Sequence, residues 1–125
     1  MIKILLACNA GMSTSLLAEM MNQAAQKEGL DCKIWCIDRE KVDSQIKECD
    51  VLLLGPQIRQ SYKRLWTKYG ETIPVAMISS TDYGHLDGEH VLQYALSLYK
   101  TFYEQKKRIE FQDWREERKE DSCRK

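Results

Sequence analysis

Short apolar runs alternate with amphipathic stretches along the first hundred residues of this chain. Residues 2–7 and 51–54 are almost wholly apolar, as is typical of strands buried on both faces of a sheet. Residues 31–37 and 73–78 are rich in β-branched and other apolar residues and predict two further strands. Apolar residues spaced three and four apart, together with capping signals, predict helices over about 13–28, 39–48, 59–69 and from 87 to beyond 103.

Strands that alternate with helices predict an α/β fold with an open, four-stranded parallel sheet. The apolar strands need cover on both faces, so helices should lie on both sides in a doubly wound arrangement. Right-handed crossovers favour the strand order 2-1-3-4. Ligands of such sheets bind outside the carboxyl ends of the strands. This rule places three predicted loops around one crevice: residues 8–15, 55–58 and 79–84.

The loop from Cys8 to Ser15 carries the strongest chemical signal in the chain. It joins the first strand to the first helix, and Gly11 permits a close backbone approach. The amides and dipole of a helix N-terminus attract anions, and Ser13, Thr14 and Ser15 add hydroxyl groups. The same features favour a thiolate over a thiol. We therefore predict that Cys8 is a nucleophile at the rim of an anion-binding loop.

Composition and charge narrow the possible function classes. Nineteen basic and nineteen acidic residues balance, which gives no bias towards nucleic acid. We expect a cytoplasmic protein, because the sequence has neither a membrane-spanning apolar run nor a signal-peptide pattern. No group of metal-ligand residues lies near the loop in the sequence, so we predict no metal and no cofactor. The length suits one domain over residues 1–103, followed by a charged helical extension or tail over 104–125.

Several other residues have simpler structural interpretations. Five irregularly spaced cysteines argue against a disulfide framework, and Cys32 and Cys36 are expected to be small core residues. Trp35 and Trp66 are also predicted to lie in the core. Apolar Ala10 and Met12 in an exposed loop suggest a docking surface. His85 is interpreted as an incidental surface histidine.

Three segments together resemble the IIB component (EIIB) of bacterial phosphotransferase systems, within its lactose/cellobiose class. They are the C-x-A-G-M-S-T-S motif at 8–15, the Leu-Leu-Gly-Pro-Gln-Ile segment at 53–58, and Tyr83-Gly84 followed by Asp87-Gly88. The resemblance covers residues 1 to about 103 in matching order. The fold it implies is similar to that of low-molecular-weight tyrosine phosphatases.

The resemblance implies that Cys8 accepts a phosphoryl group from a phosphohistidine of an EIIA protein. Cys8 would then pass the group to a sugar, expected to be a β-linked disaccharide of the cellobiose type, bound in the membrane component EIIC. The chain would be a monomer that meets EIIC at the inner face of the membrane. Gln57, Asp82 and Tyr83 are expected to line the crevice. The implied phosphate-binding loop consists of Asn9, Ala10, Gly11, Met12, Ser13, Thr14 and Ser15.

Two alternatives from other classes remain open. A phosphatase of this fold would use Cys8 as nucleophile and Asp82 as general acid, but it needs an arginine six residues after the cysteine to bind the phosphate. Thr14 occupies that position. A thiol-based redox domain would need a second, resolving cysteine. We predict structural positions for the candidates Cys32, Cys36 and Cys49.

Overall fold

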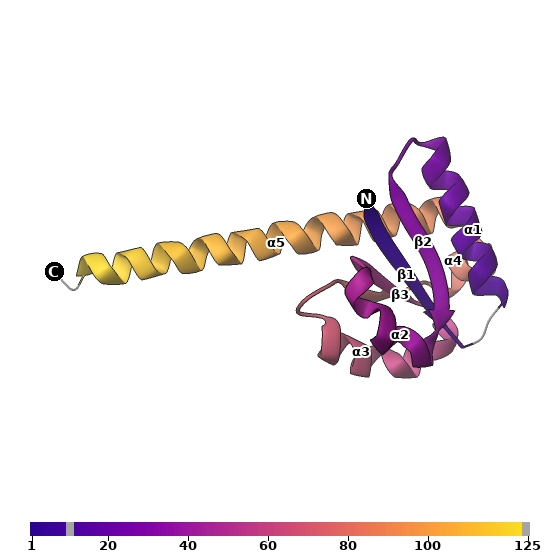
Figure 1. The fold of residues 1–125 in the computed structure, drawn as a ribbon, viewed down its shortest axis with the longest axis horizontal. Helices are drawn as coiled ribbons and strands as arrows, with labels where there is room; N and C mark the ends of the chain where they lie inside the picture. Colours follow the sequence, from indigo (N-terminus) through magenta and orange to yellow (C-terminus); the bar gives the residue numbers. More distant parts are fainter. Residues whose placement is uncertain (10–11, 124–125) are drawn as a thin grey trace.

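A computed structural model describes residues 1–9 and 12–123, with the backbone alone for residues 12, 13 and 108–123. Its four parallel strands form a single sheet in the order β2-β1-β3-β4, which confirms the predicted topology (Figure 1). The strands are β1 (Ile2–Cys8), β2 (Cys32–Asp38), β3 (Val51–Leu54) and β4 (Val75–Met77).

Helices cover both faces of the sheet, as expected for strands that are apolar on both sides. The helices α1 (Met12–Lys27) and α5 (Gly88–Cys123) enclose one core with Ile4 and Leu6 of β1. The other core contains Leu5 and Ala7 of β1. Its cover comprises α2 (Val42–Gln45), η2 (Ile46–Glu48), η3 (Pro56–Ser61) and α3 (Tyr62–Tyr69). The short η1 (Arg39–Lys41) leads from β2 into α2 and has no buried residue.

The carboxyl ends of the strands lie together at one edge of the sheet. Cys8, the last residue of β1, pairs with Asp38 at the end of β2. Beyond β3, the Gly55 amide donates to the Ala7 carbonyl oxygen across 2.9 Å. The parallel register therefore brings the loops after β1 and β3 to the same edge, as the sequence predicts.

Two local predictions are wrong. The predicted loop at 79–84 contains a short helix, α4 (Ser80–Gly84), because the Ser79 side chain accepts a hydrogen bond from the Asp82 amide and caps the turn. Trp66 is not a core residue: its side chain is 54% exposed, while the neighbouring Leu65 is fully buried. Cys32 and Cys36 are partly buried against the core of α1 and α5, in agreement with the sequence interpretation.

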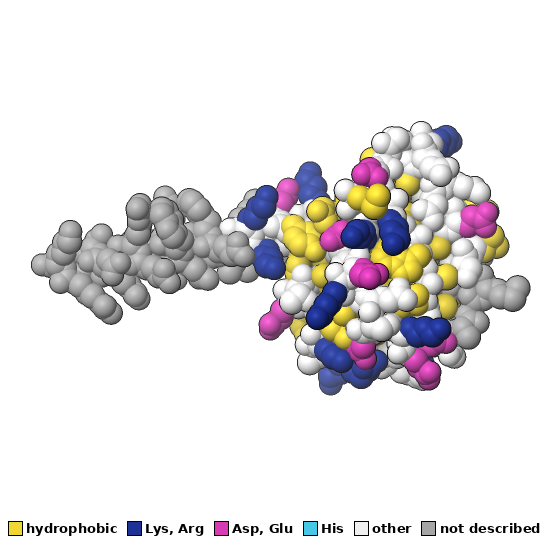
Figure 2. All heavy atoms as spheres, in the orientation of Figure 1, with side chains coloured by type: hydrophobic (Ala, Val, Ile, Leu, Met, Phe, Trp, Pro, Cys, Tyr) yellow, Lys and Arg dark blue, Asp and Glu magenta, His cyan; other side chains and the backbone are white. Residues whose placement is uncertain are grey.

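The last helix is much longer than the sheet that it covers. After packing against the sheet, α5 continues to Cys123 and projects away from the body of the molecule (Figure 1). Basic and acidic side chains are interspersed over the described part of the face shown in Figure 2, in keeping with the balanced charge of the sequence.

Candidate functional site

Cys8 lies at the point where the direction of the chain crossovers reverses. Strand β1 has β2 on one side and β3 on the other, so its carboxyl end is the topological switch point of the sheet. The Cys8 side chain is only 4% exposed, and its Sγ donates to the Ile37 carbonyl oxygen across 3.7 Å. The fold therefore places a sulfur atom at the position where open α/β sheets bind ligands.

The loop that follows Cys8 leads directly into the N-terminus of α1. Asn9 is exposed, and the helix begins at Met12. The first four amides of a helix have no partner within it, so the amides of residues 12–15 are available to an anion. The predicted roles of Ala10 and Gly11, and of the Met12 and Ser13 side chains, fall outside the described residues. For Asn9, Thr14 and Ser15 the phosphate-binding role likewise stays a prediction.

The hydroxyl groups of Thr14 and Ser15, in the predicted loop, both have partners within the fold. Thr14 is fully buried, and its Oγ1 lies 3.1 Å from the hydroxyl oxygen of Tyr83. Ser15 is exposed, and its Oγ lies 3.1 Å from Sγ of Cys36 on β2. The structure thus brings Tyr83 to the first turn of α1, through a contact that the sequence does not reveal.

Gln57 lies in the segment after β3, and its place in the crevice stays a prediction. It is exposed, and its Oε1 would stand only 2.7 Å from a Cβ atom added to Gly55. Gly55 is itself bonded to Ala7, the residue before Cys8. Gln57 consequently covers the turn after β3 and belongs to the same edge of the sheet as Cys8.

Asp82 makes a contact that the sequence analysis missed. Its Oδ2 lies 2.7 Å from Nδ1 of His90 on α5, and this hydrogen bond and the carboxylate charge raise the pKa of the histidine. Asp87 accepts from the His90 amide and caps α5. Ligand atoms of these three residues lie within 4.8 Å of one another, but each is accounted for by the cap or by the ion pair. In the sequence, the signal that draws attention to His90 is its position three residues after Asp87, the residue that caps α5.

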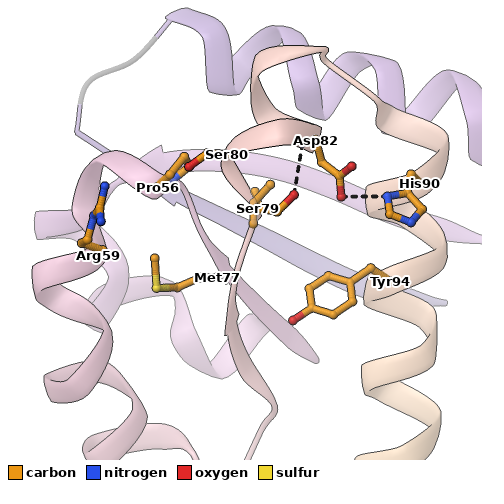
Figure 3. Close-up of a pocket in the computed structure, with 9 residues that line it drawn as sticks. Pro56, Arg59, Met77, Ser79, Ser80, Asp82, His90 and Tyr94 are labelled. Atoms are coloured by element: carbon orange, nitrogen blue, oxygen red, sulfur yellow. Dashed lines mark hydrogen bonds and ion pairs between the residues drawn. The ribbon is translucent and has the colours of Figure 1, made fainter.

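A pocket of about 490 Å³ opens next to this ion pair (Figure 3). Figure 3 shows Asp82, His90 and Tyr94 on one side of the pocket and Pro56, Arg59 and Met77 on the other. The pocket is bordered by the segments that follow β3 and β4. The pocket therefore lies at the carboxyl ends of the strands, on the side of β4.

Two of the candidate resolving cysteines, Cys32 and Cys49, have raised pKa values. Burial raises the pKa of Cys49 to about 12, and its Sγ donates to the Ile46 carbonyl oxygen. Burial also raises the pKa of Cys32. Because a thiolate is the reactive form of cysteine, neither residue is suited to attack a partner sulfur at neutral pH. This chemistry disfavours Cys32 and Cys49 as resolving cysteines of a redox domain.

No helix among the described residues is long and apolar enough to cross a membrane.

Comparison with curated proteins identifies relatives over most of the chain. It is 38% identical over 97 residues to the oligo-beta-mannoside-specific EIIB component of the phosphotransferase system (PTS) of Bacillus subtilis, covering 77% of this chain and 94% of the relative. It is 39% identical over 102 residues to the cellobiose-specific EIIB component of Lactococcus lactis subsp. lactis, covering 76% and 94%. The galactose-specific EIIB component of Lactococcus lactis subsp. cremoris is also 39% identical over 102 residues, with 76% and 94% covered.

Solved structures agree with these relatives. The cellobiose-specific IIB component of Borrelia burgdorferi superposes with a TM-score of 0.69 at 36% identity, covering 80% of this chain and 93% of that one. The lactose-specific IIB domain of Streptococcus pneumoniae shares the fold, with a TM-score of 0.72 at 21% identity and coverage of 78% and 97%. The family model for the lactose/cellobiose-specific IIB subunit of the PTS matches residues 3–94. The chain therefore belongs to the lactose/cellobiose-specific IIB family of the phosphotransferase system.

Proposed function

We propose that this EIIB protein carries the phosphoryl group of its sugar phosphotransferase system on Cys8. The observation that carries the proposal is the position of Cys8, at the carboxyl end of the central strand β1 and directly before the N-terminus of α1. EIIB components of the PTS are phosphotransferases, and phosphoryl transfer needs an in-line nucleophile and stabilisation of the equatorial oxygens. Cys8 would supply the nucleophile.

Two displacements at phosphorus would complete the transfer. In the first, the Cys8 thiolate attacks the phosphorus atom of the phosphohistidine of EIIA, and an S–P bond forms. The N–P bond breaks, and the imidazole leaves with the bonding electrons. In the second, a sugar hydroxyl oxygen attacks and an O–P bond forms. The S–P bond breaks to regenerate the thiolate, and the hydroxyl proton passes to solvent. The amides of residues 10–15 would hold the equatorial oxygens in both steps. Neither displacement requires a metal or cofactor.

The proposed partners are an EIIA donor and the membrane component EIIC, which the protein would meet from the cytoplasm. We propose a β-linked disaccharide of the cellobiose type as the sugar. Support comes from the cellobiose-specific relative, whereas other relatives are specific for oligo-β-mannosides or galactose.

Hydrolysis by the same fold is the alternative that the site disfavours. The position where a phosphatase needs a phosphate-binding arginine holds Thr14, which is neutral and fully buried. Asp82, the candidate general acid, forms an ion pair with His90. A bidentate guanidinium contact is about twice as strong as a neutral hydrogen bond, and losing one oxyanion donor costs on the order of a hundredfold in rate. A phosphocysteine in this loop should therefore persist until an acceptor arrives.

Transfer and hydrolysis can be compared in one preparation. The protein should take up one phosphoryl group from phosphorylated EIIA and release it to sugar in vesicles that contain EIIC. It should turn over p-nitrophenyl phosphate no faster than the Cys8→Ser variant does. Steady release of many equivalents of p-nitrophenol per second, abolished by Cys8→Ser, would instead identify a phosphatase.

A further inference from the structure

We infer that Tyr83 is a positioning residue for phosphoryl transfer, acting on the Cys8 loop through the buried hydroxyl of Thr14. This role rests on the proposed function, because it concerns the loop that would hold the phosphoryl group. Tyr83 belongs to α4, which follows β4, whereas Thr14 lies in the first turn of α1. Their oxygens are 3.1 Å apart although the residues are 69 positions apart in the chain.

Because Thr14 is buried, the loss of this hydrogen bond would leave its hydroxyl group without a partner and away from water. Thr14 is the only polar or charged residue that the described part of the chain buries fully, and the Tyr83 ring packs against the core formed by α1 and α5. A buried hydroxyl without a partner costs more than a hydrogen bond contributes when it is made. The first turn of α1 is thus held at the orientation that lets Thr14 reach Tyr83.

A second contact fixes the segment that carries Tyr83. A Cβ atom added to Gly88 would lie 2.5 Å from the backbone carbon of Met20, so the start of α5 approaches α1 more closely than a side chain would allow. Between α4 and α5, Leu86 has a positive φ of 51°, a conformation that is unfavourable for leucine. The packing of Leu86 against the core maintains this turn.

The consequence for the site follows from the position of Thr14 in α1. The amides of residues 12–15 are the donors that the helix offers to an anion, and Thr14 is among them. Catalysis by such donors depends on their being held in position before the reaction begins. The hydrogen bond between Tyr83 and Thr14 would therefore orient the amides, and Tyr83 itself would not touch the phosphoryl group.

The test compares Tyr83→Phe, Thr14→Val and the double variant in the full chain. Each single variant should lower kcat for phosphoryl transfer from phosphorylated EIIA about fivefold, the effect of one hydrogen bond, with KM for EIIA unchanged. The double variant should be no slower than the slower single variant, because both substitutions remove the same contact. Tyr103→Phe is the matched control. Its hydroxyl donates to the Asp50 carbonyl oxygen across 3.3 Å, just before β3 and at the opposite edge of the sheet, so its loss should leave kcat unchanged.

Two results would overturn the inference: transfer by Tyr83→Phe at the wild-type rate, or a double variant slowed by the product of the two single effects. Amide chemical shifts of residues 12–15 in the unphosphorylated protein give a separate readout. They should move in Tyr83→Phe and not in Tyr103→Phe. If wild-type protein accepts no phosphate at all, the proposed function fails, while unchanged shifts in Tyr83→Phe would refute the role of Tyr83 independently.

Discussion

Thr14 and Ser15 are neighbours in the sequence, yet their hydroxyl groups contact different parts of the fold. Thr14 is buried against Tyr83 of α4, whereas Ser15 is exposed beside Cys36 of β2. The Thr14 backbone amide, in the first turn of α1, is a donor that the helix offers to an anion whichever partner its hydroxyl takes. The loop would then work chiefly through the amides at the start of α1, which a helix N-terminus supplies whatever its side chains are.

Two neighbouring residues of α3 test which of its side chains stabilise the core. Leu65→Ala should lower the free energy of unfolding by about 2–5 kcal/mol, because Leu65 is fully buried and its loss leaves a cavity. Trp66→Ala should cost less than about 1.5 kcal/mol, since the larger side chain is 54% exposed. Urea unfolding measures both. A greater loss from Trp66→Ala would show that this residue belongs to the core after all.

The error over Trp66 shows what residue periodicity can and cannot predict. The spacing of Tyr62, Leu65, Trp66 and Tyr69 predicts an amphipathic helix, and α3 spans these residues. Spacing does not determine how far the buried face extends around the helix. Tyr62 and Tyr69 pack at the edge of the core, and Trp66 lies outside it. The long-range Thr14–Tyr83 contact was equally inaccessible, because it depends on the packing of α4 near α1.

At the scale of elements, strands were the easiest to predict and α4 the hardest. The run over β3 is apolar because both faces of that strand are buried, so its sequence is distinctive. Helix α4 has five residues and no apolar periodicity, and its Ser and Thr residues are typical of loops. Ser79 followed three residues later by Asp82 is a capping pattern, and it is the signal of the helix start that the sequence contains.

The close approach of α5 to α1 gives a test at this scale. Gly88→Ala should destabilise the fold by about 1–3 kcal/mol, because the added methyl group would overlap the backbone at Met20 and Met21. Gly84→Ala is the matched control, since a Cβ atom there meets nothing within 4 Å. Thermal unfolding of the two variants makes the comparison. Equal melting temperatures would mean that the helices separate without cost.

For the whole molecule, sheet order and family could both be predicted from the sequence, whereas the extent of α5 could not. The topology follows from two apolar runs and right-handed crossovers, and the family from motifs placed at the loops of one sheet edge. The relatives are matched by only 76–77% of this chain, and the family model ends at residue 94. Mixed charges over 104–125 allow either a helix or a frayed tail, so composition alone did not decide between them.

Removal of residues 104–125 tests whether the domain is complete at Tyr103. Truncation should leave phosphoryl transfer intact and shift the melting temperature by less than about 4 °C, because the sheet and the core residues whose side chains the structure describes lie within the first 103 residues. The Tyr103 contact with Asp50 is retained. Light scattering should report a monomer both before and after truncation. A dimer that dissociates on truncation would assign an assembly role to the extension.

Peptide mass spectrometry after incubation with phosphorylated EIIA tests the central proposal most directly. Under conditions that preserve phosphocysteine, one phosphate should be found, on the peptide that contains Cys8, and Cys8→Ser should take up none. A Cys36→Ser variant, altered at the partly buried cysteine beside Ser15, should still be phosphorylated on Cys8. Phosphate on a histidine or on another cysteine, retained in Cys8→Ser, would contradict the assignment of Cys8 as the phosphoryl carrier.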